Sequence, residues 1–339
     1  MRFVAIAAGL AAALAPATTR AEGEAAAFFQ NKQIQFFTMG SPGGGYDAYT
    51  RAIAARLEKS LGAHVVTINE PAAGGLVAMN RLLTARPDGL SLLLVGGESL
   101  AIASLMGEPG VNYDPLKQVW LARVSAESKV ALIGPKSPYN SIADLVASQR
   151  PSMWAGSGKT DGNTDFQALL AHATGMKARM VIGYKGTGGM NIAMENGEID
   201  GRVVSDESAA LYGPSSGMRV IATLARQRAP SFPAAPTVFE AARLSPEAAA
   251  MLDWRAGIAA LGRVIAVTPG APADRVEHLR ATLRAVLVDP GFIAEMRNMK
   301  LSASYAPASE VGDMMARAMK TLDARGLAEI KSIVIDRYY

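Results

Sequence analysis

Short apolar segments alternate with amphipathic helical segments along most of this chain. Residues 34–39, 65–68 and 90–95 are predicted strands because each is a short apolar run bounded by turn residues. Between the first two, residues 48–61 carry apolar side chains at intervals of four, the spacing of a helix with one buried face. Strand–helix alternation of this kind is typical of an α/β fold with a largely parallel sheet. We therefore predict the α/β class.

The alternation starts again in the middle of the chain. Residues 130–133 form another predicted strand, and residues 258–267 form a later one that precedes a mostly helical tail. A chain of 339 residues is long enough for about two domains. We expect one domain built from residues 22–130 and 256–339, with a second domain, residues 131–255, inserted in it.

The N-terminus has the pattern of an export signal. Arg2 precedes an uncharged, largely apolar stretch at residues 3–17, and small residues then occupy the signal-peptidase positions of Thr19-Arg20-Ala21. The apolar stretch is shorter than the ~20 residues that span a bilayer. An N-terminal membrane anchor is the alternative. We predict cleavage of residues 1–21 and a mature protein in the periplasm.

Composition excludes several classes of function. The chain has no cysteine, which removes disulfides, thiolate metal sites and cysteine nucleophiles. Its three histidines, His64, His172 and His278, are far apart in the sequence and show no metal-ligand spacing. The formal charge is only +4, and no block of basic residues indicates nucleic-acid binding. We expect no metal, no cofactor and no catalytic constellation.

A first glycine-rich loop separates the predicted strand at residues 34–39 from the helix that follows. Glycines allow successive N–H groups to converge, and a helix N-terminus adds partial positive charge, so such a loop suits a carboxylate or phosphate. A dinucleotide site and a plain structural turn are alternatives, since the loop meets only the looser form of the dinucleotide pattern. The loop comprises Ser41, Pro42, Gly43, Gly44, Gly45, Tyr46 and Asp47.

A second loop contains the sequence Gly156-Ser157-Gly158-Lys159-Thr160, which resembles the end of a P-loop. The full motif requires glycine where this chain has Met153, and we expect the segment before the loop to be too short for a good buried strand. We therefore predict no nucleotide site here.

A third glycine-rich loop, residues 183–189, again lies between a predicted strand and a predicted helix. Its Lys185 is a candidate ligand cation, with a solvated loop charge as the alternative. Asp206 and Glu207 follow a further predicted strand, where they could contact a ligand or cap a helix. Anion-receptive loops on two α/β units favour a cleft that closes on a small acid.

An ordered series of short motifs covering residues 33–310 resembles one protein family. Each motif is weak alone, but all occur in the family's order. The chain is similar to the Bug-type extracytoplasmic solute receptors of tripartite tricarboxylate transporters. The motifs are Pro42-Gly43-Gly44-Gly45-Tyr46-Asp47, Asn69-Glu70-Pro71-Ala72-Ala73-Gly74-Gly75, Pro87-Asp88-Gly89, Tyr113-Asp114-Pro115, Gly183-Tyr184-Lys185-Gly186, Gly197-Glu198-Ile199-Asp200-Gly201, Ala235-Pro236-Thr237-Val238-Phe239-Glu240, Trp254-Arg255-Ala256-Gly257 and Pro269-Gly270-Ala271-Pro272.

The resemblance implies a periplasmic-binding-protein fold of the "Venus flytrap" type. Two α/β domains would be joined by crossing strands near residues 130–133 and 254–258, with the ligand cleft between them. Backbone N–H groups of the glycine loops, rather than a buried counter-ion, would hold a ligand carboxylate. The residues expected at the ligand site are Ser41, Pro42, Gly43, Gly44, Gly45, Tyr46, Asp47, Gly74, Ser157, Gly158, Gly162, Asn163, Thr164, Tyr184, Lys185, Gly186 and Asp206.

The function implied is capture of a small carboxylate, such as a di- or tricarboxylate, by a monomeric receptor that delivers it to membrane transporter subunits. Phe166-Gln167 occupies a place where the family often has His-Leu, which leaves the identity of the acid open. An exported enzyme acting on an anionic substrate is an alternative, for which Asp206, Glu207 and Tyr184 are the candidate residues. A receptor that senses its ligand for a membrane kinase is another.

Overall fold

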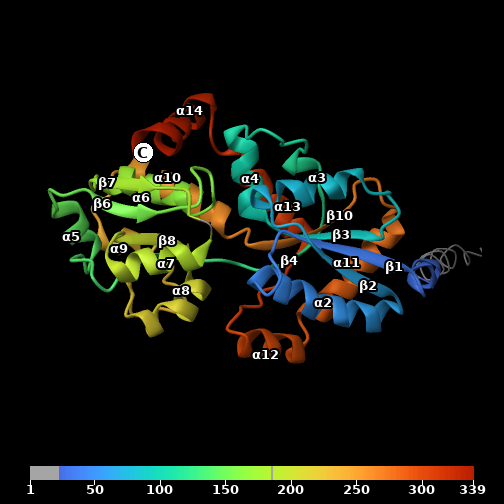
Figure 1. Cartoon of the computed structure of the whole chain (residues 1–339). Coiled ribbons are helices and arrows are strands. Elements are labelled where there is room, and N and C mark those ends of the chain that lie inside the picture. Colours follow the sequence, from blue (N-terminus) through green and yellow to red (C-terminus); the bar gives the residue numbers. More distant parts are fainter. Residues whose placement is uncertain (1–22, 185) are drawn as a thin grey trace, which may run out of the picture.

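The computed structural model describes residues 23–184 and 186–339, so the predicted export signal and Lys185 lie outside the described residues. Two β-sheets organise these residues, and we call each sheet with its covering helices a lobe (Figure 1). None of the described helices is both long enough and apolar enough to span a bilayer.

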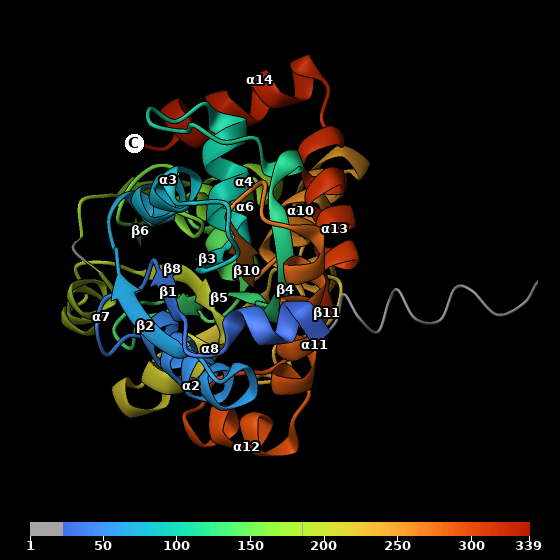
Figure 2. The same cartoon turned by 90° about the vertical axis from the view of Figure 1, so that its right-hand side faces the viewer.

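The first lobe contains a six-stranded sheet in the order β11-β4-β10-β3-β1-β2. β1 pairs in parallel with β2 and β3, whereas β10 is antiparallel to β3 and β4. Helices cover both faces of this sheet (Figure 1, Figure 2). The strands are β1 (Gln33–Thr38), β2 (His64–Asn69), β3 (Ser91–Gly96), β4 (Val119–Ser125), β10 (Arg263–Val267) and β11 (Ala306–Pro307); the helices are α2 (Gly45–Leu61), α3 (Leu76–Thr84), α4 (Gly97–Met106), α11 (Ala273–Leu287), α12 (Pro290–Asn298) and α13 (Ala308–Lys320).

The second lobe contains a five-stranded sheet in the order β7-β6-β8-β5-β9. β6 is parallel to β7 and β8, and β5 is antiparallel to β8 and β9. Its strands are β5 (Lys129–Ile133), β6 (Ser152–Ala155), β7 (Ala178–Val181), β8 (Gly201–Ser205) and β9 (Arg219–Thr223); its helices are α5 (Ile142–Ala147), α6 (Thr164–Thr174), α7 (Thr187–Asn196), α8 (Asp206–Tyr212), α9 (Val238–Ala241) and α10 (Pro246–Ala259).

Helix α2 shows why the sequence pattern predicts the core of the first lobe. Its apolar residues Ile53, Leu57 and Leu61 recur every four positions and are all buried. Gly62 then ends the helix in the left-handed conformation, with a φ of 61°, which glycine adopts without a Cβ clash. The helix predicted at residues 48–61 is confirmed.

The strand predicted at residues 258–267 is correct only in its second part. Residues 254–258, where the resemblance implied a crossing strand, belong to helix α10, and strand β10 begins at Arg263. Ser245 accepts a hydrogen bond from the Ala248 N–H and caps α10, and Pro246 occupies its first turn. The helix packs against α4 and α6 through its C-terminal half, where Leu252, Trp254 and Ile258 are buried. Apolar runs of this kind do not distinguish strand from helix by periodicity.

The short strand β6 was not expected to be a buried strand, and this expectation is wrong. Its four residues occupy an interior position of the five-stranded sheet. The Trp154 side chain is fully buried and donates a hydrogen bond from Nε1 to Ser152 Oγ at 2.9 Å. One large aromatic side chain compensates for the shortness of the strand because it buries so much apolar area.

The C-terminal segment returns to the second lobe after α13. Helix α14 (Ala324–Ser332) lies above the molecule in Figure 1, and the π-helical turn η4 (Ile333–Arg337) packs on α6. The Met180 N–H donates to the Tyr338 carbonyl at 2.7 Å. Strand β7 of the second lobe is therefore held by the end of the chain.

Candidate functional site

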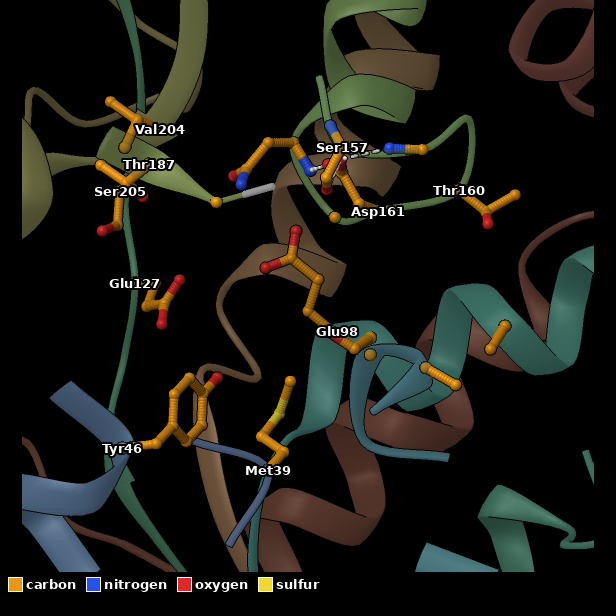
Figure 3. Close-up of a pocket in the computed structure, with 18 of the residues that line it drawn as sticks. Met39, Tyr46, Glu98, Glu127, Ser157, Thr160, Asp161, Thr187, Val204 and Ser205 are labelled. Carbon is orange, nitrogen blue, oxygen red and sulfur yellow. Dashed lines mark hydrogen bonds between the residues drawn. The ribbon is translucent and has the colours of Figure 1, made fainter. Parts of the chain in front are cut away.

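A cavity of about 670 Å³ lies where the two lobes face each other (Figure 3). Met39 and Tyr46 follow strand β1 and line it from the first lobe, while Ser157 and Asp161 follow β6 and line it from the second. The volume is within the range of small-molecule sites, and loops at strand ends are the usual lining of such sites in α/β proteins. This cavity is the candidate ligand site.

The described residues among those expected at the site divide into two groups in the structure. Seven of them line the cavity, namely Tyr46, Gly74, Ser157, Gly158, Gly162, Asn163 and Gly186. Lys185 lies outside the described residues. Those that are not among the lining residues are Ser41, Pro42, Gly43, Gly44, Gly45, Asp47, Thr164, Tyr184 and Asp206.

The first glycine loop is closed by a carboxylate of its own. Asp47 accepts hydrogen bonds from the Gly43 N–H at 2.9 Å, from Arg51 Nε at 2.9 Å and from Asn69 Nδ2 at 3.0 Å. The hydrogen bond from Arg51, helped by that from Gly43, lowers the pKa of Asp47 to about 2. Asp47 therefore uses the Gly43 amide that was expected to face a ligand.

The second glycine loop is closed in the same way, by Asp161 (Figure 3). The carboxylate accepts from four backbone N–H groups and from two hydroxyls. These donors are the N–H groups of Ser157 (2.8 Å), Gly158 (3.1 Å), Asn163 (2.9 Å) and Thr164 (2.8 Å), together with Ser157 Oγ and Thr164 Oγ1. The N–H groups of the loop thus converge as they do in an anion-binding site, and the Asp161 carboxylate occupies that position.

Replacing Asp161 with alanine should loosen this loop. Burial opposes ionisation of Asp161, but the hydrogen bonds from Ser157 and Thr164 outweigh it and hold the pKa of the carboxyl below its ordinary value. Hydrogen bonds to a charged group contribute about 1.5–3 kcal/mol. We expect amide hydrogen exchange across residues 157–164 to accelerate at least ~10-fold in the variant.

The pH dependence of hydrogen exchange in the wild-type protein is a second test of the role of Asp161. A group with a lowered pKa in the folded state stabilises it above the unfolded pKa and loses this effect as pH falls. Exchange protection of residues 157–164 should therefore decline as pH falls below about 4, after correction for intrinsic exchange rates. Equal protection in the variant and the wild type at pH 7 would contradict the role of Asp161.

Buried ion pairs cross the cavity floor between the lobes. Lys129 Nζ donates to Glu98 at 2.9 Å, to Glu127 at 3.0 Å and to Asn163 Oδ1 at 3.2 Å. Arg263 lies 3.1 Å from Glu127 and 3.2 Å from Glu207. Burial opposes the charge on Lys129, but Glu127 and Glu98 outweigh it and raise the pKa of the ammonium. These cations are fixed by the protein's own carboxylates.

Arg202 differs from Lys129 and Arg263, the other described cations that line the cavity, because no described carboxylate forms an ion pair with it. It lies in strand β8, and only 3% of the residue is exposed. Its Nη1 lies 3.8 Å from the sulfur of Met190, while Nε and Nη2 have no hydrogen-bond partner within residues 23–184 and 186–339. Burial lowers the pKa of Arg202 to about 10, so the side chain is still charged at neutral pH. A desolvated guanidinium without a partner is costly, and this favours an external anion as its partner.

A family model described as the tripartite tricarboxylate transporter family receptor, TctC, matches residues 49–323. This chain belongs to that family. The motif-based resemblance is confirmed.

Curated relatives of this receptor cover most of its length. A UPF0065 protein of Bordetella bronchiseptica is 26% identical over 267 residues, which are 77% of this chain and 74% of that protein. Protein BugT of Bordetella pertussis is 29% identical over 216 residues, 62% of this chain and 65% of that protein.

Solved structures of periplasmic binding proteins show the same fold. The receptor matches BugD with a TM-score of 0.69 at 20% identity, over 89% of this chain and 97% of that one. It matches Rhodopseudomonas palustris MatC with bound malate at 0.68 and 20% identity, over 89% and 99%. It also matches an R. palustris protein with adipate at 0.72 and 19% identity, over 89% and 97%. The predicted two-domain periplasmic-binding-protein fold is confirmed.

The residues considered for an exported enzyme do not gather at the receptor's cavity. Asp206 accepts a hydrogen bond from Ser231 Oγ at 2.9 Å, and burial raises the pKa of its carboxyl. Glu207 accepts from the Ser302 N–H at 2.7 Å and pairs with Arg263. Neither of them, nor Tyr184, is among the cavity-lining residues. The family and the structural neighbours are solute-binding proteins.

Lys159 of the P-loop-like sequence contacts the C-terminal segment. Its Nζ donates to the Ile335 carbonyl at 2.6 Å and lies 4.6 Å from the centroid of the Tyr339 ring. Lys159 is not among the cavity-lining residues. In the part of the chain that the structure describes, no group of three or more acidic or histidine side chains is arranged to hold a metal ion.

Sequence reasoning missed the charged residues that give the cavity its character, which are Glu98, Glu127, Lys129, Arg202 and Arg263. A usable signal was present. Arg202, Lys129 and Arg263 each lie within or at the start of a short apolar strand, where every residue is buried. A charge is rarely placed on such a strand without a partner or a function.

Proposed function

We propose that this receptor captures a small carboxylate in the periplasm and delivers it to the membrane subunits of a tripartite tricarboxylate transporter. The observation that supports this most directly is the unpartnered guanidinium of Arg202 in the cavity between the lobes. A guanidinium matches a carboxylate in shape and charge because its N–H groups can donate in parallel to both oxygens.

Helix α7 supports an anion near the same wall. Gly186 is the N-cap residue of the helix and Thr187 is its first residue; both line the cavity, and no side chain of the described residues caps this N-terminus. The N-terminal end of a helix carries partial positive charge. Arg202 and α7 together would stabilise a ligand carboxylate on the second lobe.

Ligand binding would also change the conformation of the receptor, so that the transporter subunits could distinguish the loaded form from the empty one. Residues of both lobes line the cavity, so a ligand held there contacts both lobes only when they are closed. A ligand that contacts the closed state more extensively shifts the population toward it. The closed, loaded receptor would be the form that the transporter subunits recognise. The structures with adipate and malate in similar proteins are consistent with such a ligand.

Calorimetry and thermal denaturation of the purified protein test the proposal. The probes are butanoate, adipate, malate and 4-aminobutanoate, with butanamide as a control that lacks a carboxylate. At least one acid should bind and raise Tm by mass action, and mass spectrometry should recover it chemically unchanged. If no acid binds, or if an acid is converted to a product, the proposal is wrong.

The export part of the proposal gives a separate prediction. The mature receptor isolated from the periplasm should have the mass of residues 22–339, because signal peptidase would cleave after Ala21. Intact-mass spectrometry measures this, and the same measurement under native conditions should give the mass of a monomer. Recovery only from the cytoplasm with residues 1–21 retained would contradict periplasmic delivery.

A further inference from the structure

Two carboxylates point into the cavity from the side of the first lobe and the connection between the lobes. Glu98 belongs to α4, and Glu127 follows β4 (Figure 3). Their side chains are 7% and 8% exposed, so both are nearly desolvated, and both line the cavity. A ligand that fills this space must come close to them.

The cations beside these two carboxylates are already engaged. An ammonium has three N–H donors, and those of Lys129 point to Glu98, Glu127 and Asn163 at 2.9–3.2 Å. Arg263 contacts Glu127, Glu207 and, at 3.0 Å, Ser125 Oγ, all through Nη1, while its Nε has no hydrogen-bond partner among the described residues. A ligand carboxylate at this end would find no free donor on Lys129 and would lie beside two like charges, which is unfavourable in a desolvated site.

The same carboxylates can accept further hydrogen bonds. Each ionised carboxylate offers about four lone-pair positions, and the oxygens of Glu98 and Glu127 use only part of that capacity on Lys129, Arg255 and Arg263. Among the described residues that line the cavity, the acidic ones, Glu98, Glu108, Glu127 and Asp161, also outnumber the basic ones, Lys129, Arg202 and Arg263. The charge pattern favours a donor at this end of the ligand.

We infer that the ligand is an amine-bearing carboxylic acid, whose carboxylate pairs with Arg202 and whose protonated amine donates to Glu98 and Glu127. This inference rests on the proposed function, since it assigns the carboxylate end to Arg202. At the position where a di- or tricarboxylate would have its second carboxylate, this ligand has a protonated amine, a group of opposite charge.

A matched ligand series tests the inference on the wild-type protein. The series compares ω-amino acids of three to six carbons with diacids in which a carboxylate replaces the amine, and with the corresponding simple monoacids; 4-aminobutanoate, glutarate and butanoate are one such set. Calorimetry should show the best amino acid binding about 10- to 100-fold more tightly than its diacid and its monoacid, because of the charge-assisted hydrogen bonds to the amine.

The outcomes separate this inference from the proposed function. If a diacid binds as tightly as its amino acid or more tightly, the inference is wrong and the carboxylate receptor stands. If the monoacid binds as tightly as the amino acid, the amine is not recognised and the inference is also wrong. If no acid of any kind binds, both the inference and the proposed function are wrong.

A charge-neutral variant tests which residues recognise the amine. Glu127→Gln should reduce the preference for 4-aminobutanoate over butanoate by about 10-fold, whereas Glu277→Gln, on the exposed side of α11, should leave it unchanged. Glu98→Gln is the second variant, in case Glu127→Gln does not fold. An unchanged preference in a folded variant of both glutamates would overturn the assignment.

Discussion

Replacing Arg202 with methionine is expected to weaken carboxylate binding at least ~100-fold while leaving the receptor folded. The guanidinium lines the cavity, and its Nε and Nη2, which are buried in the ligand-free protein, have no hydrogen-bond partner among the described residues. Each charge-assisted hydrogen bond to a ligand carboxylate contributes about 1.5–3 kcal/mol, so losing two removes two or more orders of magnitude in affinity. Calorimetry with the best carboxylate from the panel measures the change.

The thermal stability of the ligand-free Arg202→Met variant should not fall with its affinity. Arg202 is a buried charge without a partner, and methionine has a similar length without a desolvation cost. We therefore expect the Tm of the ligand-free Arg202→Met protein to be equal to or higher than that of the wild type. Lower affinity together with retained stability distinguishes loss of a ligand contact from loss of the fold.

Arg179→Met is a matched control for this experiment. Arg179 lies in β7 of the same sheet, but its side chain is exposed and is not among the cavity-lining residues. It should change neither affinity nor Tm appreciably. If Arg202→Met binds the acid within about threefold of the wild type, Arg202 is not the carboxylate partner.

Replacing Arg255 with methionine is expected to destabilise the receptor by about 3–5 kcal/mol, the typical cost of removing one partner of a buried ion pair. The Arg255 side chain is completely buried. It donates to Glu98 at 2.5 Å and to Asp165 at 2.6 Å and 3.0 Å, and also to the Gly162 carbonyl at 2.8 Å. It therefore links α4 of the first lobe to α6 of the second.

The cost arises mainly at Asp165. Glu98 keeps its contact with Lys129 in the variant, whereas the ion pair of Asp165 is with Arg255. A buried carboxylate without a counter-ion is strongly unfavourable. Thermal denaturation should show a Tm lower by roughly 10 °C, from the usual shift of a few degrees per kcal/mol in chains of this size.

Two further variants test whether the loss of stability comes from the buried ion pair. Adding Asp165→Asn to Arg255→Met should recover part of the lost stability, because it removes the unpaired charge. Arg226→Met is the control, since the Arg226–Asp253 pair is exposed and such pairs contribute only about 0–1 kcal/mol. A Tm loss for Arg255→Met no larger than that of the control would show that the buried pair does not stabilise the receptor.

The sequence alone was sufficient for the fold class, and it predicted part of the cavity lining. Apolar periodicity is a local property, so it located α2 from Ile53, Leu57 and Leu61, and it located β3 and β5 to within a residue or two. The glycine-rich loops at residues 41–47 and 156–162 contain lining residues such as Tyr46 and Ser157, although the strand before the second loop was not predicted. The order of motifs then identified the family.

The three-dimensional structure decided what those loops and the charged residues do. Asp47 and Asp161 close their own loops through local hydrogen bonds, which apolar periodicity does not reveal, and Asn69 adds a longer-range contact to Asp47. Backbone amide groups alone were expected to hold the ligand, but buried cations also line the cavity. Their pairing depends on contacts between distant parts of the sequence. Arg202 lies in β8 at a wall of the cavity where no carboxylate of the described residues pairs with it, while Lys129 and Arg263 meet carboxylates from distant parts of the sequence. Charge pairing depends on distances between chain segments, and hydrophobic periodicity contains no information about those distances.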